Sequence, residues 1–317
     1  MKELELIVAS TRSEAEGIMS LELRSPTAQP LPPFTAGAHI DLKLTTDLIR
    51  SYSLSNDPAE RDRYVLAVNN EPNSRGGSRH IHEKLCAGDL VKANSPRNLF
   101  ELNEHAPHSV LIGGGIGITP LKAMLARLRT IGASWKLLYC TRSREATAFL
   151  NEFEQIEKEQ PDRIKFHIDN EVGCTPDLRK FVESEPKESH FYCCGPLPML
   201  AAFENATSSL PRGRVHTEYF AANKHFSEDK QVKIVLHRSK VEIDLLPGQT
   251  ILDALLEAGV VVPFSCSEGI CGSCEVRVLE GIPDHRDQVL CASDRATNER
   301  MLVCCSRSKS DVLVLDL

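Results

Sequence analysis

The sequence predicts three domains: an all-β domain, an α/β domain with a parallel sheet, and a small C-terminal domain. Three observations carry this prediction. Short apolar runs interrupted by prolines fill the first hundred residues. Strands and helices then alternate, and a glycine-rich turn, Gly113–Pro120, follows the first of these strands. Four cysteines gather near the C-terminus of a chain of 317 residues, which is long enough for two or three domains.

The composition argues against several classes of partner. The net charge of −7 does not suit nucleic acid, which needs a basic surface. No apolar run approaches the length of a membrane span, and the N-terminus lacks the apolar core of a signal peptide. Several of the 11 cysteines lie inside apolar runs, which is typical of free thiols in a reducing compartment. We therefore expect a cytoplasmic protein that binds neither nucleic acid nor membrane.

The all-β domain is expected over residues 1–104. Residues 40–44 alternate between apolar and polar side chains, as in a strand buried on one face, and Tyr64–Val68 is a second short run. The prolines of Pro30–Pro33 exclude a helix there. Short strands with frequent turns predict an antiparallel barrel or sandwich.

The α/β domain is expected over residues 105–223. Its predicted strands are Ser109–Ile112, Trp135–Cys140, Ile164–Ile168 and His190–Cys194. Helices are predicted after the glycine-rich turn and at Phe149–Glu159, Leu178–Val182 and Pro198–Ser208. Alternation of this kind is typical of a parallel sheet.

A polar segment, residues 224–231, is the predicted linker to the third domain, residues 232–317. That domain opens with two strand-like runs, Val232–Leu236 and Val241–Leu245, followed by a helix at Thr250–Ala258. The cysteine loop comes directly after the helix.

The glycine-rich turn is a candidate nucleotide site. Glycines let a phosphate approach the backbone, and a helix N-terminus offers free N–H groups. A plain tight turn remains the alternative, because Pro120 stands where the third glycine of G-x-G-x-x-G would be. A second turn, Cys194–Pro196, ends a later strand, where ligands of open α/β sheets bind. The candidate contacts in the two turns are Gly114, Gly115, Gly117, Thr119, Pro120, Cys194, Gly195 and Pro196.

Two further residues bear on which nucleotide binds. Arg142 could meet a 2′-phosphate and so favour NADPH. Asp169, at the end of another strand, could accept a hydrogen bond from a ribose hydroxyl and so favour NADH. The residues alone leave both nucleotides open.

The cysteines Cys266, Cys271 and Cys274 follow the pattern C-x4-C-x2-C, and Cys304 comes after 29 more residues. This is the spacing of a plant-type [2Fe–2S] cluster, in which each iron takes two thiolates. Zinc is the alternative, although this spacing is unusual for it. Cys305 adjoins Cys304, and the spacing favours Cys304 as the fourth ligand.

The order of motifs resembles a known family. The two glycine turns and the segment Arg50-Ser51-Tyr52-Ser53 occur here in the order seen in the ferredoxin–NADP reductase superfamily. With a C-terminal plant-type ferredoxin domain, the whole chain resembles the phthalate dioxygenase reductase family, and most of all the reductase subunits of vanillate O-demethylases. Further matching stretches are Ser74–Ser78, Glu218–Phe220 and Pro283–Asp287.

The resemblance implies a flavin barrel, a nucleotide domain and a β-grasp ferredoxin domain. It implies FMN in the barrel, although the motif alone does not separate FMN from FAD, and it tips the nucleotide toward NADH. The implied FMN contacts are Arg50, Ser51, Tyr52, Ser53, Gly76, Gly77, Ser78 and Phe220. The residues implied to take part in hydride transfer are Ser53, Phe220, which would shield the flavin, and Cys194, which would lie beside the nicotinamide.

The implied function is electron transfer from NADH through FMN and the cluster to the Rieske centre of a separate oxygenase, with the reductase as a monomer. Two alternatives remain at this point. One is a stand-alone flavin reductase acting on a quinone or another free acceptor. The other is a redox sensor that is not an enzyme and would not need the nicotinamide site.

Overall fold

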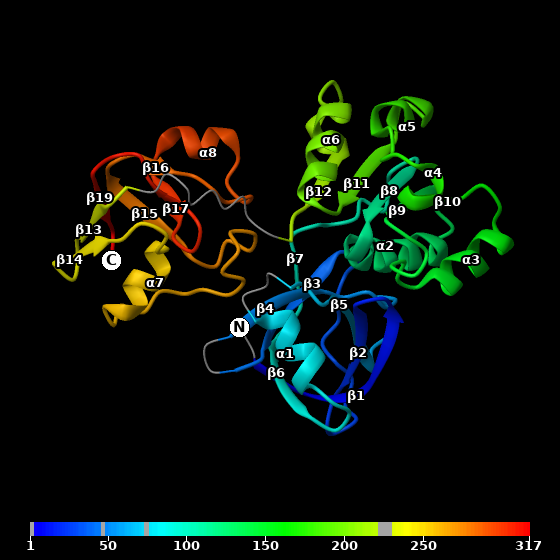
Figure 1. Ribbon diagram of the computed structural model, residues 1–317, viewed down its shortest axis with the longest axis horizontal. Coiled ribbons are helices and arrows are strands. Elements are labelled where there is room, and N and C mark those ends of the chain that lie inside the picture. The colour runs from blue at the N-terminus through cyan, green and yellow to red at the C-terminus, as the bar shows by residue number, and fades with distance from the viewer. Residues whose placement is uncertain (1–2, 46–47, 73–75, 221–229) are drawn as a thin grey trace. The chain divides into compact units, whose positions relative to one another are not determined.

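The computed structural model describes residues 3–45, 48–72, 76–220 and 230–317. The chain divides into two compact units, Met1–Glu218 and Tyr219–Leu317. The first unit holds an antiparallel barrel and a parallel α/β sheet, and the second holds the cysteine loop (Figure 1). The predicted domain boundaries stay predictions, and most of the predicted linker lies outside the described residues.

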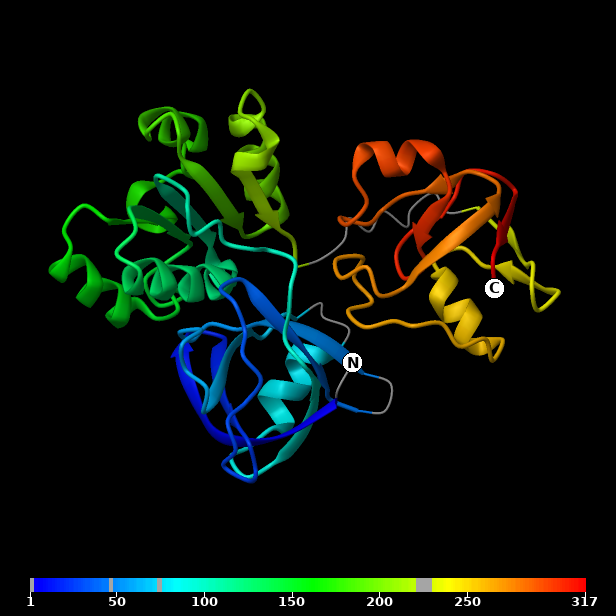
Figure 2. The same ribbon diagram turned by 180° about the vertical axis from the view of Figure 1, so that it is seen from behind.

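The barrel is a seven-stranded antiparallel sheet in the order β4-β3-β6-β1-β2-β5, with β7 paired to β3. The two ends of the sheet meet, because the Ser55 N–H donates to the Val65 carbonyl at 2.8 Å. Figure 2 shows the long blue strands curving round the core. The strands are β1 (Glu3–Ala15), β2 (Ile18–Arg24), β3 (Ala38–Lys43), β4 (Ile49–Ser53), β5 (Arg63–Asn69), β6 (Leu90–Asn94) and β7 (Arg97–Asn98).

The barrel also carries one helix, α1 (Gly77–Lys84), in a domain for which the sequence predicted only strands and turns. Ile81 is its one large apolar residue in the core, and His82 Nε2 lies 2.9 Å from the Val68 carbonyl oxygen. A helix with a single buried apolar side chain leaves no period in the sequence.

The second sheet is parallel throughout, in the order β10-β9-β8-β11-β12, which confirms the α/β prediction. Figure 1 shows α2 and α3 on one face and α5 and α6 on the other. The strands are β8 (Ser109–Gly114), β9 (Trp135–Thr141), β10 (Ile164–Ile168), β11 (His190–Cys194) and β12 (Val215–Glu218). The helices are η1 (Gly115–Gly117), α2 (Ile118–Thr130), α3 (Leu150–Glu159), α4 (Asp169–Val172), α5 (Leu178–Ser184), α6 (Leu197–Thr207) and η2 (Arg212–Arg214).

This strand order fixes where a ligand can sit. The chain runs outward from β8 through β9 to β10, then returns to the other side of β8 to form β11 and β12. The reversal lies between β8 and β11, and open α/β sheets bind ligands at the carboxyl ends of the strands at such a point. Both predicted glycine turns follow these two strands.

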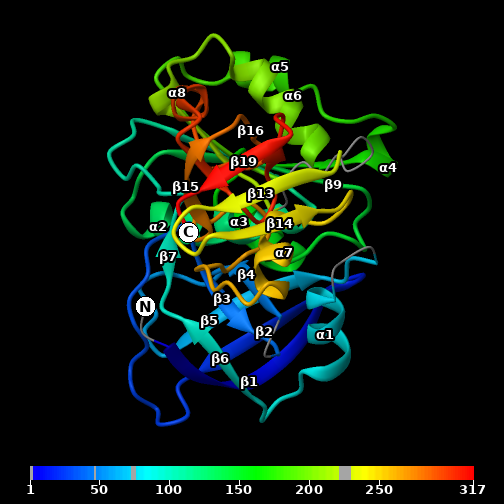
Figure 3. The ribbon, with the colours of Figure 1, turned by 90° about the vertical axis from the view of Figure 1, so that its left-hand side faces the viewer.

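The second unit is built on a mixed sheet in the order β14-β13-β19-β15-β17, in which only β13 and β19 are parallel. Figure 3 shows α7 beside β13 and β14. The strands are β13 (Val232–Leu236), β14 (Val241–Leu245), β15 (Glu275–Glu280), β16 (Pro283–Asp284), β17 (Arg300–Leu302), β18 (Arg307–Ser308) and β19 (Val312–Leu315); the helices are α7 (Ile251–Glu257) and α8 (Ala292–Thr297).

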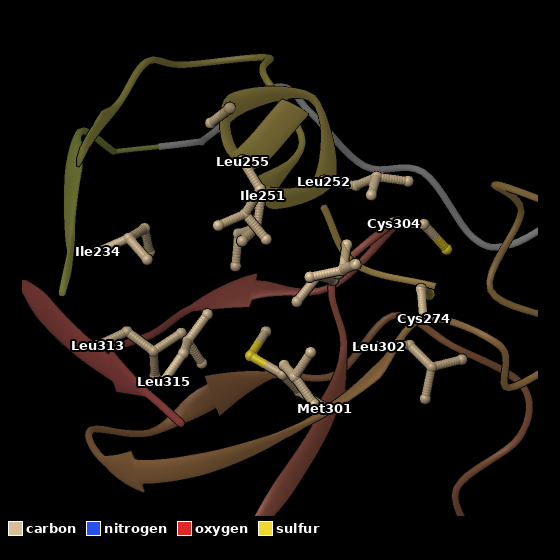
Figure 4. Packing of buried hydrophobic residues seen from close by; sticks show 14 of the residues in the cluster. Ile234, Ile251, Leu252, Leu255, Cys274, Met301, Leu302, Cys304, Leu313 and Leu315 are labelled. Atoms are coloured by element: carbon tan, nitrogen blue, oxygen red, sulfur yellow. The ribbon is translucent and has the colours of Figure 1, made fainter. Parts of the chain in front are cut away.

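The core of this unit reaches the cysteines. Apolar side chains from α7, β13, β17 and β19 pack together, and Figure 4 shows Cys274 and Cys304 at one end of the group, away from Leu313. Cys274 is 2% and Cys304 is 1% exposed. The core therefore holds two of the four predicted cluster ligands. No helix in the described part of the chain is both long and apolar enough to span a membrane.

Candidate functional site

The two glycine turns touch each other at the carboxyl edge of the parallel sheet. A Cβ at Gly117 would lie 2.3 Å from the Cys194 carbonyl oxygen, and a Cβ at Gly114 would lie 2.7 Å from Pro196 Cδ. Neither position can carry a side chain unless the backbone shifts. Gly115 has a φ of +53° and open space around it. The sequence prediction assigned all three glycines to phosphate contact, and the structure adds this packing role for Gly114 and Gly117.

Two helices begin at this edge: α2 follows the first turn, and α6 follows the second with Pro196 as its N-cap. Their N–H groups and dipoles suit the pyrophosphate of a dinucleotide. Pro120 lies in the first turn of α2, where a missing N–H is harmless. Thr119 is 2% exposed and its hydroxyl donates to the Ile116 carbonyl at 3.0 Å, so this hydroxyl is already engaged within the turn.

The residues considered for nucleotide choice lie on neighbouring strands. Arg142 follows β9 directly and is exposed, and Asp169 follows β10. Because Thr141 pairs with Ile168, both residues belong to the same edge of the sheet. Asp169 Oδ1 lies 3.5 Å from His167 Nε2. The positions of Arg142 and Asp169 do not favour NADH over NADPH.

Cys194 belongs to a buried chain of polar groups that the sequence did not reveal. Parallel pairing of β11 and β12 sets Cys194 opposite Glu218, and their side chains are hydrogen-bonded. Ser53 Oγ, at the end of β4, donates to Glu218 Oε2 at 3.4 Å. The contact joins residues 165 positions apart. It links the predicted hydride-transfer residues Ser53 and Cys194 through a carboxyl group of the last strand.

The Cys194 thiol is completely buried, and burial raises its pKa well above the ordinary value. A nicotinamide can reach this sulfur only after neighbouring groups move. Phe220, the third predicted hydride-transfer residue, follows two positions after Glu218 and is half-buried. Its place against a flavin stays a prediction.

Arg50 and the start of α1 form the candidate phosphate site of the barrel. Gly77 leaves the room that the Arg50 side chain fills: a Cβ at Gly77 would lie 2.6 Å from Arg50 Cγ. Gly76 adopts a φ of +86° just before the helix. A guanidinium group held over a helix N-terminus fits an anionic phosphate, so this observation supports the predicted FMN contacts. The Ser78 hydroxyl accepts the Glu71 N–H at 3.2 Å.

Tyr52 and Ser51, the next two residues of the flavin motif, are held by the interior of the barrel. Tyr52 packs against the barrel core, and burial raises the pKa of its hydroxyl. Ser51 donates to the buried Asp41 carboxylate at 2.6 Å, and Arg97 pairs with the same carboxylate at 2.5 Å. The Ser51 hydroxyl therefore serves the internal network of the barrel, which leaves its backbone as the group that can meet a flavin.

The cysteine loop holds sulfur atoms close together. The side chains of Cys266, Cys271 and Cys304 are in hydrogen-bonding contact. The pKa of Cys271 is raised, first by its hydrogen bond with Cys266, then by burial, and then by repulsion between the two neighbouring thiolates. Ferric or ferrous iron would relieve this repulsion. The loop therefore fits a cationic iron centre.

Backbone N–H groups already point at two of the sulfurs. Glu268 N–H donates to Cys266 Sγ at 3.3 Å, and Gly269 N–H donates to Cys304 Sγ at 3.2 Å. Such bonds stabilise thiolate ligands of iron–sulfur clusters. No three His, Cys, Asp or Glu side chains of the described residues converge as on a single metal ion. A binuclear cluster divides its four thiolates between two irons.

Comparisons with known proteins identify the domains. An oxidoreductase NAD-binding domain matches residues 111–205, and a 2Fe-2S iron-sulfur cluster binding domain matches residues 234–309. The chain is 48% identical to phenoxybenzoate dioxygenase subunit beta of Ectopseudomonas oleovorans, covering 96% of this chain and 94% of that one. It is 46% identical to tetrachlorobenzoquinone reductase of Sphingobium chlorophenolicum, covering 99% and 98%.

Among solved structures, phthalate dioxygenase reductase matches with a TM-score of 0.81 and 39% identity over 99% of this chain and 98% of that one. The chain belongs to the phthalate dioxygenase reductase family. The predicted fold class and family are confirmed. As an oxidoreductase of this family, the chain uses an NAD-binding domain and a [2Fe–2S] domain, and the predicted cofactors, NADH, FMN and the cluster, are those of phthalate dioxygenase reductases.

For this family member, Glu218 gives folding stability a distinct pH dependence. Burial raises the pKa of this carboxyl from an ordinary value of 4.5 to about 8, against hydrogen bonds from Ser53 and Cys194 that lower it. Between these two values the folded chain binds a proton that the unfolded chain has released. The contribution of Glu218 to the free energy of unfolding is therefore complete below pH 4.5. It decreases as the pH rises and is lost once the pH passes about 8.

The Glu218→Gln variant should lack this decline, because glutamine stays neutral throughout. We expect its urea midpoint to change less than that of the natural protein between pH 5 and pH 8. Glu204→Gln, an exposed change on α6, is the matched control and should follow the natural protein. Equal pH dependence in all three proteins would show that Glu218 is ionised in the folded state.

Proposed function

We propose that this protein is an NADH-dependent reductase that passes electrons through FMN and its [2Fe–2S] cluster to the Rieske centre of a separate oxygenase acting on a small aromatic compound. The observation that carries the proposal is the Ser53–Glu218–Cys194 chain, which joins the flavin motif of the barrel to the nicotinamide motif of the parallel sheet. FMN, when bound, accepts two electrons as a hydride and releases them one at a time, which suits a one-electron cluster.

The chain's own residues bind and orient these groups. Arg50 and the N-terminus of α1 hold the FMN phosphate, with Gly76, Gly77 and Ser78 shaping the loop. Tyr52 and Phe220 flank the ring, and Ser53 lies within hydrogen-bonding reach of its reactive edge. The two glycine turns hold the NADH pyrophosphate, and Cys194 lines the place of the nicotinamide. Arg142 and Asp169 lie at the ribose end, where we assign NADH. The cluster ligands are Cys266, Cys271, Cys274 and Cys304.

Lys122 supports the arrangement by tying the two domains of the first unit together. Its Nζ lies 3.4 Å from the Ser55 carbonyl oxygen, two residues beyond Ser53, and 2.9 Å from Glu152 Oε1. The end of β4 is thereby fixed against α2, which begins at the glycine turn. Hydride transfer needs the donor and acceptor atoms to be held at close range, and rigid supports of this kind supply that.

A second function has its own support. The similarity to tetrachlorobenzoquinone reductase over 99% of this chain favours direct reduction of a quinone by the same flavin. This activity would need the NADH and FMN sites and no oxygenase. We rank quinone reduction second. The flavin could reduce a free quinone directly, which would leave the cluster domain without a partner protein to reduce.

One experiment separates the two functions. NADH is added without oxygen to the purified, cofactor-loaded protein, and flavin and cluster absorbance are followed before and after addition of a Rieske oxygenase or of a substituted benzoquinone. We expect rapid flavin bleaching, then cluster bleaching, then reoxidation by the oxygenase. Reoxidation by the quinone alone would favour the second function, and a flavin untouched by NADH would refute both.

The expected state of the protein is a cytoplasmic monomer that contacts its oxygenase transiently. The free thiols and the missing membrane-spanning helix among the described residues are consistent with this proposal. Size-exclusion chromatography with light scattering should give a mass near the 35.1 kDa of one chain.

A further inference from the structure

A buried polar group lies next to the cysteine loop and has no role in the function described so far. Asp287 is 1% exposed. His285 Nδ1 lies 3.6 Å from its Oδ1, and Arg295 Nη2 lies 3.8 Å from its Oδ2. Within the described ranges, both ring nitrogens of His285, Asp287 Oδ1 and Arg295 Nε are buried without a hydrogen-bond partner. Unsatisfied groups gathered in one place call for a functional explanation.

The segment that carries Asp287 is bonded to both ligand-bearing segments. Gln288 N–H donates to the Gly269 carbonyl at 2.8 Å, and Gly269 N–H in turn donates to Cys304 Sγ at 3.2 Å. On the other side, Arg286 N–H donates to Ser306 Oγ at 3.2 Å. A Cβ at Gly269 would lie 3.2 Å from Asp287 Cα. Asp287 is therefore packed directly against the loop that binds the cluster.

The carboxylate cannot turn away from this position. Its Oδ2 accepts N–H groups from Val289 at 3.0 Å and Leu290 at 2.7 Å, and Arg295 also donates to the Asp287 carbonyl. A fixed charge in a water-poor interior acts over longer distances than one at the surface, because little solvent screens it. Reduction adds one negative charge to the cluster, so nearby charges change its free energy.

We propose that Asp287 and Arg295 are positioning residues that set the reduction potential of the cluster in opposite directions, Asp287 lowering it and Arg295 raising it. The inference rests on the proposed cluster ligands and deepens the proposed function. A buried carboxylate opposes arrival of the electron that the reduced flavin gives up, and the guanidinium favours it. His285, in contact with the same carboxylate, is kept neutral by burial, which lowers its pKa.

The test is a redox titration of the full-length, cofactor-loaded protein, followed by the electron paramagnetic resonance signal of the reduced cluster. Asp287→Asn keeps an oxygen for the Val289 and Leu290 N–H groups while it removes the charge, and it should move the midpoint potential to a more positive value. Arg295→Gln should move it to a more negative value. Asp244→Asn is the control: Asp244 is exposed on β14, the edge strand farthest from β17 in the sheet, and its loss should leave the potential unchanged.

Unchanged potentials in both variants, or shifts of the same sign, would overturn the inference. Should Asp287→Asn fail to assemble a cluster, the sign of the Arg295→Gln shift decides alone. Failure of the proposed function looks different, because the natural protein would then show no cluster signal after NADH is added. Flavin reduction by NADH should be the same in all variants.

Discussion

Replacing Cys304 with serine should abolish the visible absorption of the cluster, whereas replacing the adjacent Cys305 should leave it in place. Both sulfurs are buried and both lie near Gly269, but they make different hydrogen bonds. Cys304 Sγ accepts an N–H from Gly269, as a thiolate ligand does. Cys305 Sγ lies 3.8 Å from the Leu302 carbonyl oxygen, to which only a protonated thiol can donate. The geometry therefore agrees with the cysteine spacing in favouring Cys304.

The measurement is iron content and visible absorption of both variants, together with NADH-driven reduction of cytochrome c and of ferricyanide. Cys304→Ser should lose cytochrome c reduction almost completely and keep ferricyanide reduction, because the flavin remains. Cys305→Ser provides the matched control, one position away in the same core. A cluster that survives in Cys304→Ser but not in Cys305→Ser would reverse the assignment.

The Gly117→Ala change should produce the second large effect, on both stability and NADH binding. A new Cβ would lie 2.3 Å from a backbone oxygen, so the two glycine turns must move apart. Inserting a methyl group into a packed site of this kind costs about 1–3 kcal/mol. Because the two turns are also the proposed pyrophosphate site, we expect the KM for NADH to rise while FMN content stays unchanged.

Gly213→Ala is the control for this prediction. Gly213 lies in η2 of the same α/β domain, and a Cβ there would meet nothing within 4 Å. Urea unfolding and steady-state kinetics of the two variants should therefore differ clearly. A Gly117→Ala protein as stable as Gly213→Ala, with a natural KM for NADH, would mean that the turns have room between them.

Elements with a continuous apolar pattern could be predicted closely from the sequence. The predicted bounds of β10, β11, β13 and β14 agree with the structure, because each is a short run bounded by polar residues or turns. Helix α2 was predicted after the glycine-rich turn, and the four apolar residues that recur on one of its faces, Leu121, Met124, Leu125 and Leu128, are all buried. By contrast α1, with Ile81 alone in the core, carries no such pattern. Local pattern therefore predicted the sheets better than this small helix.

The site was predicted less completely, for a physical reason. The cysteine spacing, the glycine turns and the Arg50–Ser53 segment are local in sequence, so each could be recognised alone. The contact of Ser53 with Glu218 depends on two strands from different sheets, and the contact of Cys194 with Glu218 depends on parallel pairing. The one signal in the sequence was Glu218, a charged residue at the end of a strand. Charged residues are common at such positions, so this signal could not identify the contact. Distant pairing of this kind needs the structure.

The close contact of the two glycine turns has a thermodynamic consequence. Flexible loops that order around a ligand lose conformational entropy at the moment of binding, and affinity falls accordingly. Here Gly114 Cα and Gly195 approach so closely that a Cβ on Gly195 would lie 3.1 Å from that Cα, so each turn restrains the other before any nucleotide arrives. That entropy is lost during folding instead. At this proposed site NADH would therefore bind to turns that are already ordered, so ordering of the turns would not reduce its affinity.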